Sequence, residues 1–151
     1  MSEVWVFFDS DTVSAGCATM RGYYSASRAL LVIAAAGLVR GVVSEQVLAE
    51  VRSVLATRLA HRALEAGEIL RELVEGYFVV VPDPTPEQVQ PFFPQVTDLD
   101  DAPILAAAVL SGCRVLVTFN TRHYGKAVGI QGMRPDAFMA LMRQAICEAI
   151  R

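Results

Sequence analysis

Short apolar runs rich in strand-forming residues alternate along the chain with longer segments in which apolar residues recur every three or four positions. The short runs are typical of buried parallel strands, because both faces of such strands are covered. The recurring pattern is typical of helices with one apolar face. Strands are expected at residues 4–8, 38–43, 77–81 and 114–117, and helices at residues 25–36, 44–75, 101–110 and 135–150. The alternation predicts one domain over residues 1–151, an α/β fold with three layers (α/β/α sandwich) and a mainly parallel central sheet of four to five strands.

Glycine, serine and proline residues divide these elements. Gly37 stops the first helix, Ser44 caps the second, and Gly76 ends its charged continuation over residues 58–75. Five of the seven prolines fall within residues 82–94, which predicts a loop with one short helix at most. The charged continuation is expected to bury its large aliphatic residues, namely Leu59, Leu64, Ile69, Leu70 and Leu73.

Polar residues gather where the predicted strands end. In open α/β sheets, functional groups lie beyond the carboxyl ends of the strands. Asp9 is the strongest candidate, because no core or capping role explains an acid directly after a buried strand. The other candidates at this edge are Asp11, Glu45, Glu50, Asp98, Asp100, Asp101, Thr118, Asn120, Arg122 and His123.

Acids that meet at one edge repel each other, and two carboxylates about 4 Å apart cost on the order of 4 kcal/mol at an effective dielectric of 20. A divalent cation is the usual solution, and Mg²⁺ needs only one or two carboxylates besides waters and a substrate phosphate. The cluster therefore fits metal-assisted phosphoryl chemistry. Some acids of the cluster also fit purely structural roles. Asp98, Asp100 or Asp101 is equally suited to capping the next helix, and Glu45 suits the exposed first turn of a helix.

The overall charge bears on nucleic-acid binding. The chain has 13 Lys and Arg against 16 Asp and Glu, a net charge of -3, which disfavours a protein that coats nucleic acid by bulk charge. The charges are unevenly spread, however: residues 83–101 carry five acids and no base, and residues 114–134 carry four bases and no acid. A cation held by the acids would leave the neighbouring bases to receive phosphates, so the charge balance does not argue against local contacts with nucleic-acid phosphates.

The cysteines and the apolar stretches indicate the compartment. Cys17, Cys113 and Cys147 lack disulfide or zinc spacing and are expected to be buried, reduced thiols. The longest uncharged apolar stretch, residues 29–39, has eleven residues, whereas a bilayer requires about 20. The chain start, Met-Ser-Glu-Val, lacks the basic residues of a signal peptide. We therefore expect a soluble, cytoplasmic protein that does not enter a membrane.

Four segments in this order resemble a PIN domain: VFFDSD at residues 6–11, SEQVLAEV at 44–51, DLDDAPILAAA at 98–108 and LVTFNTRHY at 116–124. Residues 134–138, RPDAF, resemble the entry to the last helix of that family. The resemblance covers nearly the whole chain. It implies a Mg²⁺- or Mn²⁺-dependent endoribonuclease that hydrolyses phosphodiester bonds of single-stranded or structured RNA.

The resemblance also assigns residues to roles. Asp9 matches the metal ligand after the first strand, Glu50 the helix glutamate, and Asp101 the acid before the proline-containing helix. Asp98 resembles an extra acid often found before Asp101, and Asn120 stands where many members have a fourth Asp.

The remaining assignments concern the substrate. Thr118 would position Asn120 or a water molecule, and Arg122 is the candidate phosphate contact. Asp11 and His123 complete the residues expected near the substrate. Because Asn120 replaces a carboxylate, the tight binding of a second metal ion is left open.

The resemblance implies partners as well. PIN proteins of this size resemble VapC-type toxins, which a small antitoxin holds inactive. Dimerisation through exposed apolar helix faces is expected on the same ground.

One alternative is another enzyme class. Residues 9–13, DSDTV, after a hydrophobic strand also fit the start of a haloacid-dehalogenase-like phosphatase, with Asp9 as nucleophile and Asp11 as general acid. That class requires a Thr, then a Lys, then an acidic pair along the chain. Here the pair Asp100–Asp101 precedes Thr118 and Lys126, so the order is wrong.

A second alternative is not an enzyme. A PIN-like domain that has lost a ligand can serve as an RNA-binding or assembly module, and Asn120 keeps this interpretation open.

Overall fold

The central strand of the sheet is the first one in the chain. The structure, a computed structural model, describes residues 3–151. Its five strands are β1 (Trp5–Phe8), β2 (Arg40–Ser44), β3 (Val79–Val81), β4 (Val115–Val117) and β5 (Gln131–Met133), in the order β3-β2-β1-β4-β5. All four pairings are parallel, with Phe7 opposite Val42 on one side and Leu116 on the other. The predicted α/β fold with a parallel sheet is confirmed.

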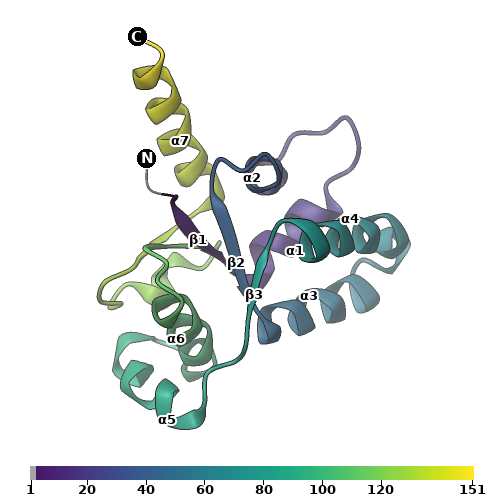
Figure 1. Cartoon of the computed structure of the whole chain (residues 1–151). Helices are drawn as coiled ribbons and strands as arrows, with labels where there is room; N and C mark the ends of the chain where they lie inside the picture. Colours follow the sequence, from purple (N-terminus) through teal and green to yellow (C-terminus); the bar gives the residue numbers. More distant parts are fainter. Residues whose placement is uncertain (1–2) are drawn as a thin grey trace.

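The helices cover both faces of this sheet (Figure 1). Helices α1 (Ser10–Ala18), α3 (Glu45–Thr57) and α4 (Ala63–Gly76) lie on one side, and α5 (Pro86–Val89) and α6 (Ala102–Leu110) lie on the other. Helix α2 (Ala26–Ala35) packs against α1 and against the C-terminal helix α7 (Pro135–Ala149). The end of α7 extends away from the rest of the molecule.

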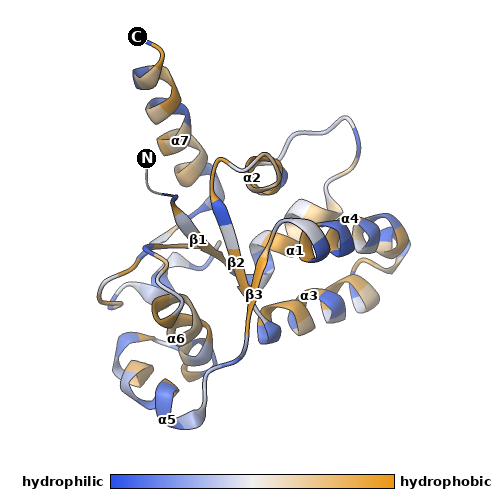
Figure 2. Cartoon of the chain, in the orientation of Figure 1, coloured by the Kyte–Doolittle hydropathy of each residue, from blue (hydrophilic) through white to orange (hydrophobic). Residues whose placement is uncertain are grey.

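The core lies between the sheet and these helices. Val6, Phe7 and Phe8 of β1 are fully buried, as the short apolar run predicts for a strand covered on both faces. Figure 2 shows β3 as hydrophobic and β2 as hydrophobic after its hydrophilic start, whereas α3 and α4 alternate between hydrophobic and hydrophilic residues. Ser44 caps α3 by accepting a bond from the Val47 amide at 3.2 Å, and Gly37 follows α2 with a φ of +79°, which favours glycine. Within residues 3–151, no helix has both the length and the apolar composition to cross a membrane.

Several expectations about single elements are wrong. The helix expected over residues 44–75 is interrupted: α3 ends at Thr57, a single 3₁₀ turn covers Ala60–Arg62, and α4 begins at Ala63. After this break Leu64 is 82% exposed rather than buried. Cys147 is exposed on α7, although Cys17 and Cys113 are buried as expected. The elements that the hydrophobic pattern did not predict are α1 and β5.

Candidate active site

Asp9 stands where β1 ends and α1 begins. One of its carboxylate oxygens accepts a bond from the Ser10 amide at 2.8 Å, so Asp9 caps α1. The expectation that Asp9 has no capping role is therefore wrong, because the sequence did not predict α1. The other oxygen accepts bonds from the hydroxyls of Thr118 at 2.9 Å and Tyr124 at 3.3 Å. Asp9 is thus held from both sides and buried.

The segment after β4 also contacts a second acid, Asp11, next to Asp9. Thr118 is fully buried, and its hydroxyl lies 2.9 Å from Asp9 and 3.2 Å from Asp11. A hydroxyl has one proton to donate, so at any moment it serves one of the two carboxylates. Asp11 also accepts bonds from the Phe119 amide at 3.0 Å and the Asn120 side-chain amide at 3.4 Å. These bonds attach α1 to the loop after β4, so most of Asp11 is occupied by the protein itself.

A third acid comes from the start of α6. The Asp101 carboxylate lies 2.8 Å from Nδ1 of His123, which donates to it when that nitrogen carries the proton. The Tyr124 hydroxyl donates to Asp9, and it also lies near enough to Asp101 to oppose the rise in pKa that burial causes there. Tyr124 therefore stands between the two acids. Asp98 has the capping role left open above, because it accepts a bond from the Asp100 amide at 3.0 Å and begins the turn Leu99–Asp101.

Glu50 approaches the cluster from α3. It is half-buried, and the Gln46 side-chain amide donates to it at 3.0 Å. Burial and the charge of Asp11 are the main causes that raise the pKa of Asp9, and the charge of Glu50 adds to them. Glu45, in contrast, is exposed, as expected for a first-turn acid.

Burial raises the pKa of Asp9, Asp11 and Asp101, and the charges of neighbouring acids add to the rise for Asp9 and Asp101. Burial, and secondly the charge of Asp11, raise the pKa of Asp9 to about 7, although bonds from Ser10 and Thr118 oppose the shift. Burial also raises the pKa of Asp11 and of Asp101, and for Asp101 the bond from His123 opposes it. Burial, and then the charges of Asp9 and Asp101, raise the pKa of Tyr124, so its hydroxyl stays protonated and remains a donor.

The family follows from comparison with known proteins. A sequence model of the PIN domain matches residues 5–122, well over half of the chain. This chain belongs to the PIN domain family. PIN domains are generally nucleases, and this match favours the nuclease interpretation over the haloacid-dehalogenase-like one. A comparison with curated proteins finds no significant match.

Solved structures show the same fold at low sequence identity. PAE2754 from Pyrobaculum aerophilum superposes with a TM-score of 0.62 at 19% identity, covering 95% of this chain and 96% of that one. A toxin-antitoxin complex from Klebsiella pneumoniae contains a chain that superposes with a TM-score of 0.61 at 20% identity, covering 86% and 97%. At such identities the likeness supports the PIN fold alone.

The residues of this PIN domain offer oxygen donors suited to a hard divalent cation. Within residues 3–151, no three His, Cys, Asp or Glu side chains lie close enough to enclose an ion by themselves. Mg²⁺ does not require such a cage, since it retains several waters and takes one or two carboxylates. Asp9 and Asp101 fit that requirement, because each is a carboxylate whose pKa is raised by burial and which a nearby cation would stabilise.

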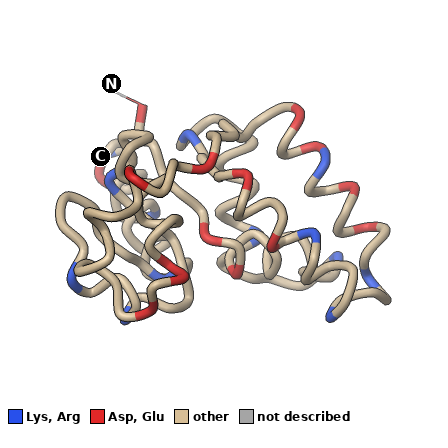
Figure 3. Tube along the Cα trace, turned by 90° about the horizontal axis from the view of Figure 1, so that it is seen from below, with Lys and Arg blue, Asp and Glu red and all other residues tan. Residues whose placement is uncertain are grey.

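Most of the predicted substrate residues lie in the loop after β4, at the exposed edge of the acid cluster, which we call the rim. Arg122 and Asn120 are exposed, and His123 is half-exposed and bonded to Asp101. Arg134 supports this rim: it donates to the Phe119 carbonyl at 3.2 Å and lies over the Phe119 ring at 5.3 Å. Seen from below the molecule, Asp and Glu residues of separate segments lie near the middle of the face (Figure 3).

Tyr124 is the residue that sequence reasoning missed. It is nearly fully buried, and its hydroxyl is the only tyrosine hydroxyl among residues 3–151 with a bond to the acid cluster. The sequence places it directly after Thr-Arg-His in a polar turn, where an aromatic residue suggests packing rather than a role in the site. The one available indication was its place at the end of the segment that resembles the family.

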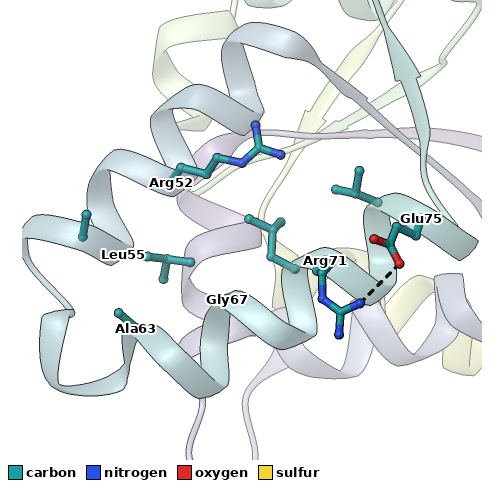
Figure 4. Close-up of a pocket in the computed structure, with 9 residues that line it drawn as sticks. Arg52, Leu55, Ala63, Gly67, Arg71 and Glu75 are labelled. Carbon is teal, nitrogen blue, oxygen red and sulfur yellow. Dashed lines mark hydrogen bonds and ion pairs between the residues drawn. The ribbon is translucent and has the colours of Figure 1, made fainter.

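A hollow between α3 and α4 is separate from this site (Figure 4). It has a volume of about 470 Å³, and none of the acids of the cluster lines it. Figure 4 shows Arg52 reaching over it from α3, while Arg71 and Glu75 of α4 form an ion pair of 3.4 Å at its edge. The acid cluster at the ends of β1 and β4 therefore remains the candidate active site of the PIN domain.

Proposed function

We propose that this PIN domain is a Mg²⁺- or Mn²⁺-dependent endoribonuclease that hydrolyses phosphodiester bonds of single-stranded or structured RNA. The observation that carries the proposal is the meeting of Asp9 and Asp101 around the Tyr124 hydroxyl, with Glu50 near enough to raise the pKa of Asp9. Keeping several carboxyl groups together in a partly buried site costs stability unless a cation offsets their charge.

Each residue of the cluster has a role in this proposal. Asp9 and Asp101 would hold the ion, with Asp98 as an additional acid near Asp101. Glu50 orients the attacking water and accepts its proton. A bound Mg²⁺ or Mn²⁺ lowers the pKa of water and offsets the charge that develops on the leaving oxygen. Thr118 and Tyr124 hold Asp9 in place through their hydroxyls.

The rim would contact the RNA backbone. Arg122 is exposed beside the cluster and suits a bidentate contact with a phosphate. Asn120 is exposed at the same loop, and its side-chain amide can reach either Asp11 or a substrate oxygen. His123 supports Asp101 through Nδ1 and presents the rest of its half-exposed ring to the substrate.

Replacement of Asp101 tests the assignment. Asp101→Asn keeps an oxygen that can accept the His123 bond but removes the charge that holds the ion. We expect cleavage of a fluorophore-labelled single-stranded RNA in Mg²⁺ or Mn²⁺ to fall at least about 100-fold, because loss of a partner outside the metal's direct ligands already costs 10- to 100-fold.

The matched control is Glu45→Gln, which removes one exposed acid outside the cluster. It should cleave at the parent rate, and circular dichroism should show the same fold for both variants. Cleavage by Asp101→Asn at the rate of Glu45→Gln would disprove the role of Asp101. A parent protein that binds no Mn²⁺ at millimolar concentration in calorimetry would instead be an RNA-binding or assembly module.

We further propose that the chain is the toxin of a pair and binds a small antitoxin protein in the cytoplasm. The support is its likeness in fold to a chain of the Klebsiella pneumoniae toxin-antitoxin complex. Growth arrest on expression, relieved by co-expression of the product of an adjacent short gene, is the expected result. Arrest that no adjacent gene relieves would count against the pair.

A further inference from the structure

A pocket of about 570 Å³ lies beside the acid cluster. It is enclosed by the start of α3, the loop after β3, α5 with the turn that follows it, and the start of α6. Its size falls in the range of small-ligand sites. The residues that define its chemistry are Phe93, Gln46, Gln90, Asp83 and Pro103.

The pocket adjoins the candidate active site through Gln46 and Pro103, although none of the acids of the cluster lines it. Gln46 lines it and donates its side-chain amide to Glu50 at 3.0 Å. The Gln46 backbone amide is bonded to Asp83, a second lining residue, at 2.8 Å. On the other side, Pro103 follows Asp101 by two positions in the same helix start. A ligand in this pocket would therefore contact groups that adjoin Glu50 and Asp101.

The lining suits a flat, uncharged ring. Phe93 is a large aromatic side chain that is 40% exposed, and three prolines of the lining add apolar surface. Gln46 and Gln90 contribute amides, which can both donate and accept hydrogen bonds. Bases of single-stranded nucleic acids bind proteins by stacking on aromatic rings and by hydrogen bonds to their edges.

The charge of the lining excludes the anionic part of a nucleotide. In the described chain, the residues that line the pocket include the acids Asp83 and Glu87 and no Lys or Arg. Carboxylates repel a phosphate but accept hydrogen bonds from an exocyclic amino group, as carried by adenine, cytosine and guanine. One oxygen of Asp83 is bonded to the Gln46 amide, which leaves the other for such a contact.

We propose that this pocket binds a base of the RNA next to the phosphate that is cleaved, with Phe93 as the stacking surface and a preference for bases that carry an exocyclic amino group. This inference rests on the proposed ribonuclease function for its place in the reaction. It makes Phe93 a specificity-determining residue rather than a catalytic one.

Nucleosides test the pocket separately from cleavage, because they contain no phosphodiester and need no metal. Adenosine, cytidine and uridine are titrated in EDTA into the ¹⁵N-labelled protein, and amide shifts are followed by NMR. We expect saturable shifts at residues 83–93 and at Gln46 for adenosine and cytidine, and weaker binding of uridine. Phe93→Leu keeps an apolar side chain without an aromatic face and should weaken adenosine binding at least about fivefold.

Two control variants isolate the aromatic contact. Phe93→Tyr retains a ring and should bind adenosine as the parent does. Tyr23→Leu removes an aromatic residue that is 71% exposed outside the pocket and should also bind normally. Absence of saturable shifts in the parent, or equal binding by Phe93→Leu, would overturn the base pocket. Equal binding of uridine would overturn the preference for an amino group. Failure of RNA cleavage by the parent would count against the ribonuclease and leave these titrations unaffected.

Discussion

Asp9 combines a structural and a chemical role in one side chain. Its first oxygen caps α1, and its second accepts hydroxyl bonds from Thr118 and Tyr124. Burial together with the charge of Asp11 raises the pKa of Asp9 to about 7. At neutral pH, metal-free protein is therefore near the point at which this buried carboxyl loses its proton. The residue that the proposal requires for metal binding is also the one that makes the metal-free fold sensitive to pH.

The free energy of unfolding should reveal this sensitivity. The folded pKa of about 7 lies above the ordinary 3.8, so folded Asp9 keeps a proton that the unfolded chain loses as the pH rises from about 4 to about 7. Stability of the parent in EDTA should fall through that window and level off above it. Asp9→Asn carries no charge, so it should be more stable than the parent at pH 8, by on the order of a few kcal/mol at most, and more stable by a smaller margin at pH 5.

Urea unfolding in EDTA at pH 5 and pH 8 measures this difference. Mg²⁺ at pH 8 should stabilise the parent and leave Asp9→Asn unchanged, because a ligand that binds only the folded state raises its stability. If the stability difference between Asp9→Asn and the parent is the same at pH 8 as at pH 5, the pKa of folded Asp9 is not raised, and the prediction is wrong.

At the scale of single elements, a helix or strand could be predicted from the sequence only where its own residues show an apolar pattern. β1 is a short apolar run that ends at Asp9, and α3 has apolar residues every three or four positions after Ser44. The sequence predicted both elements, although not the break that ends α3. The sequence did not predict α1, because its small and polar residues are buried on several sides and its sequence shows no contrast between an apolar and a polar face. β5 has the sequence Gln-Gly-Met, which lacks strand-forming residues and is a strand through its pairing with β4.

The same reasoning explains which parts of the site could be predicted. Asp9 and Asp101 could be predicted because they follow a strand or begin a helix, where the topology brings chain segments together. Glu50 lies in the second turn of α3, and its assignment rested on the resemblance to the family. The role of Tyr124 depends on a hydroxyl aimed at Asp9 from 115 residues away, and no local pattern encodes such a direction. The bonds that occupy Asp11 likewise come from the loop after β4 and depend on tertiary structure.

The contact between β2 and its neighbours gives a prediction at this scale. A Cβ atom added at Gly41 would lie 2.8 Å from the Phe78 ring and 2.9 Å from the Phe8 ring, and these two rings pack with centroids 5.7 Å apart. Gly41→Ala should therefore force the strands apart and destabilise the protein by about 1–3 kcal/mol.

The control is Gly67→Ala in α4, where an added Cβ meets nothing within 4 Å. It should stabilise the protein by about 0.5–1 kcal/mol, because alanine favours helices over glycine. Thermal unfolding of both variants provides the comparison. Equal melting temperatures for Gly41→Ala and the parent would show that the two rings move aside without cost.

At the scale of the whole molecule, α7 leaves apolar surface without cover. Its outer half extends away from the body of the protein (Figure 1), and Ile146 and Ile150 are 45% and 79% exposed. Exposed apolar surface of this kind marks sites of association. We propose that α7 contributes to a homodimer.

Sedimentation velocity over a range of concentrations tests this association. The parent should sediment at twice the monomer mass, and Ile146→Glu combined with Ile150→Glu should sediment as a monomer. Leu64→Glu changes an equally exposed leucine on α4 and should remain dimeric. A parent protein that stays monomeric at every concentration refutes the dimer, whereas dissociation by Leu64→Glu would assign the interface to α4.

The position of β1 at the centre of the sheet bears on when the protein becomes active during its synthesis. Asp9 leaves the ribosome early, but the Thr118 hydroxyl that holds it is encoded 109 residues later, and β4 must pair with β1 to bring the two together. A nascent chain shorter than this has no assembled acid cluster. A message broken upstream of that codon would therefore yield chains without the assembled cluster, and a nascent chain of the proposed nuclease could not itself cut RNA until most of its message had been translated.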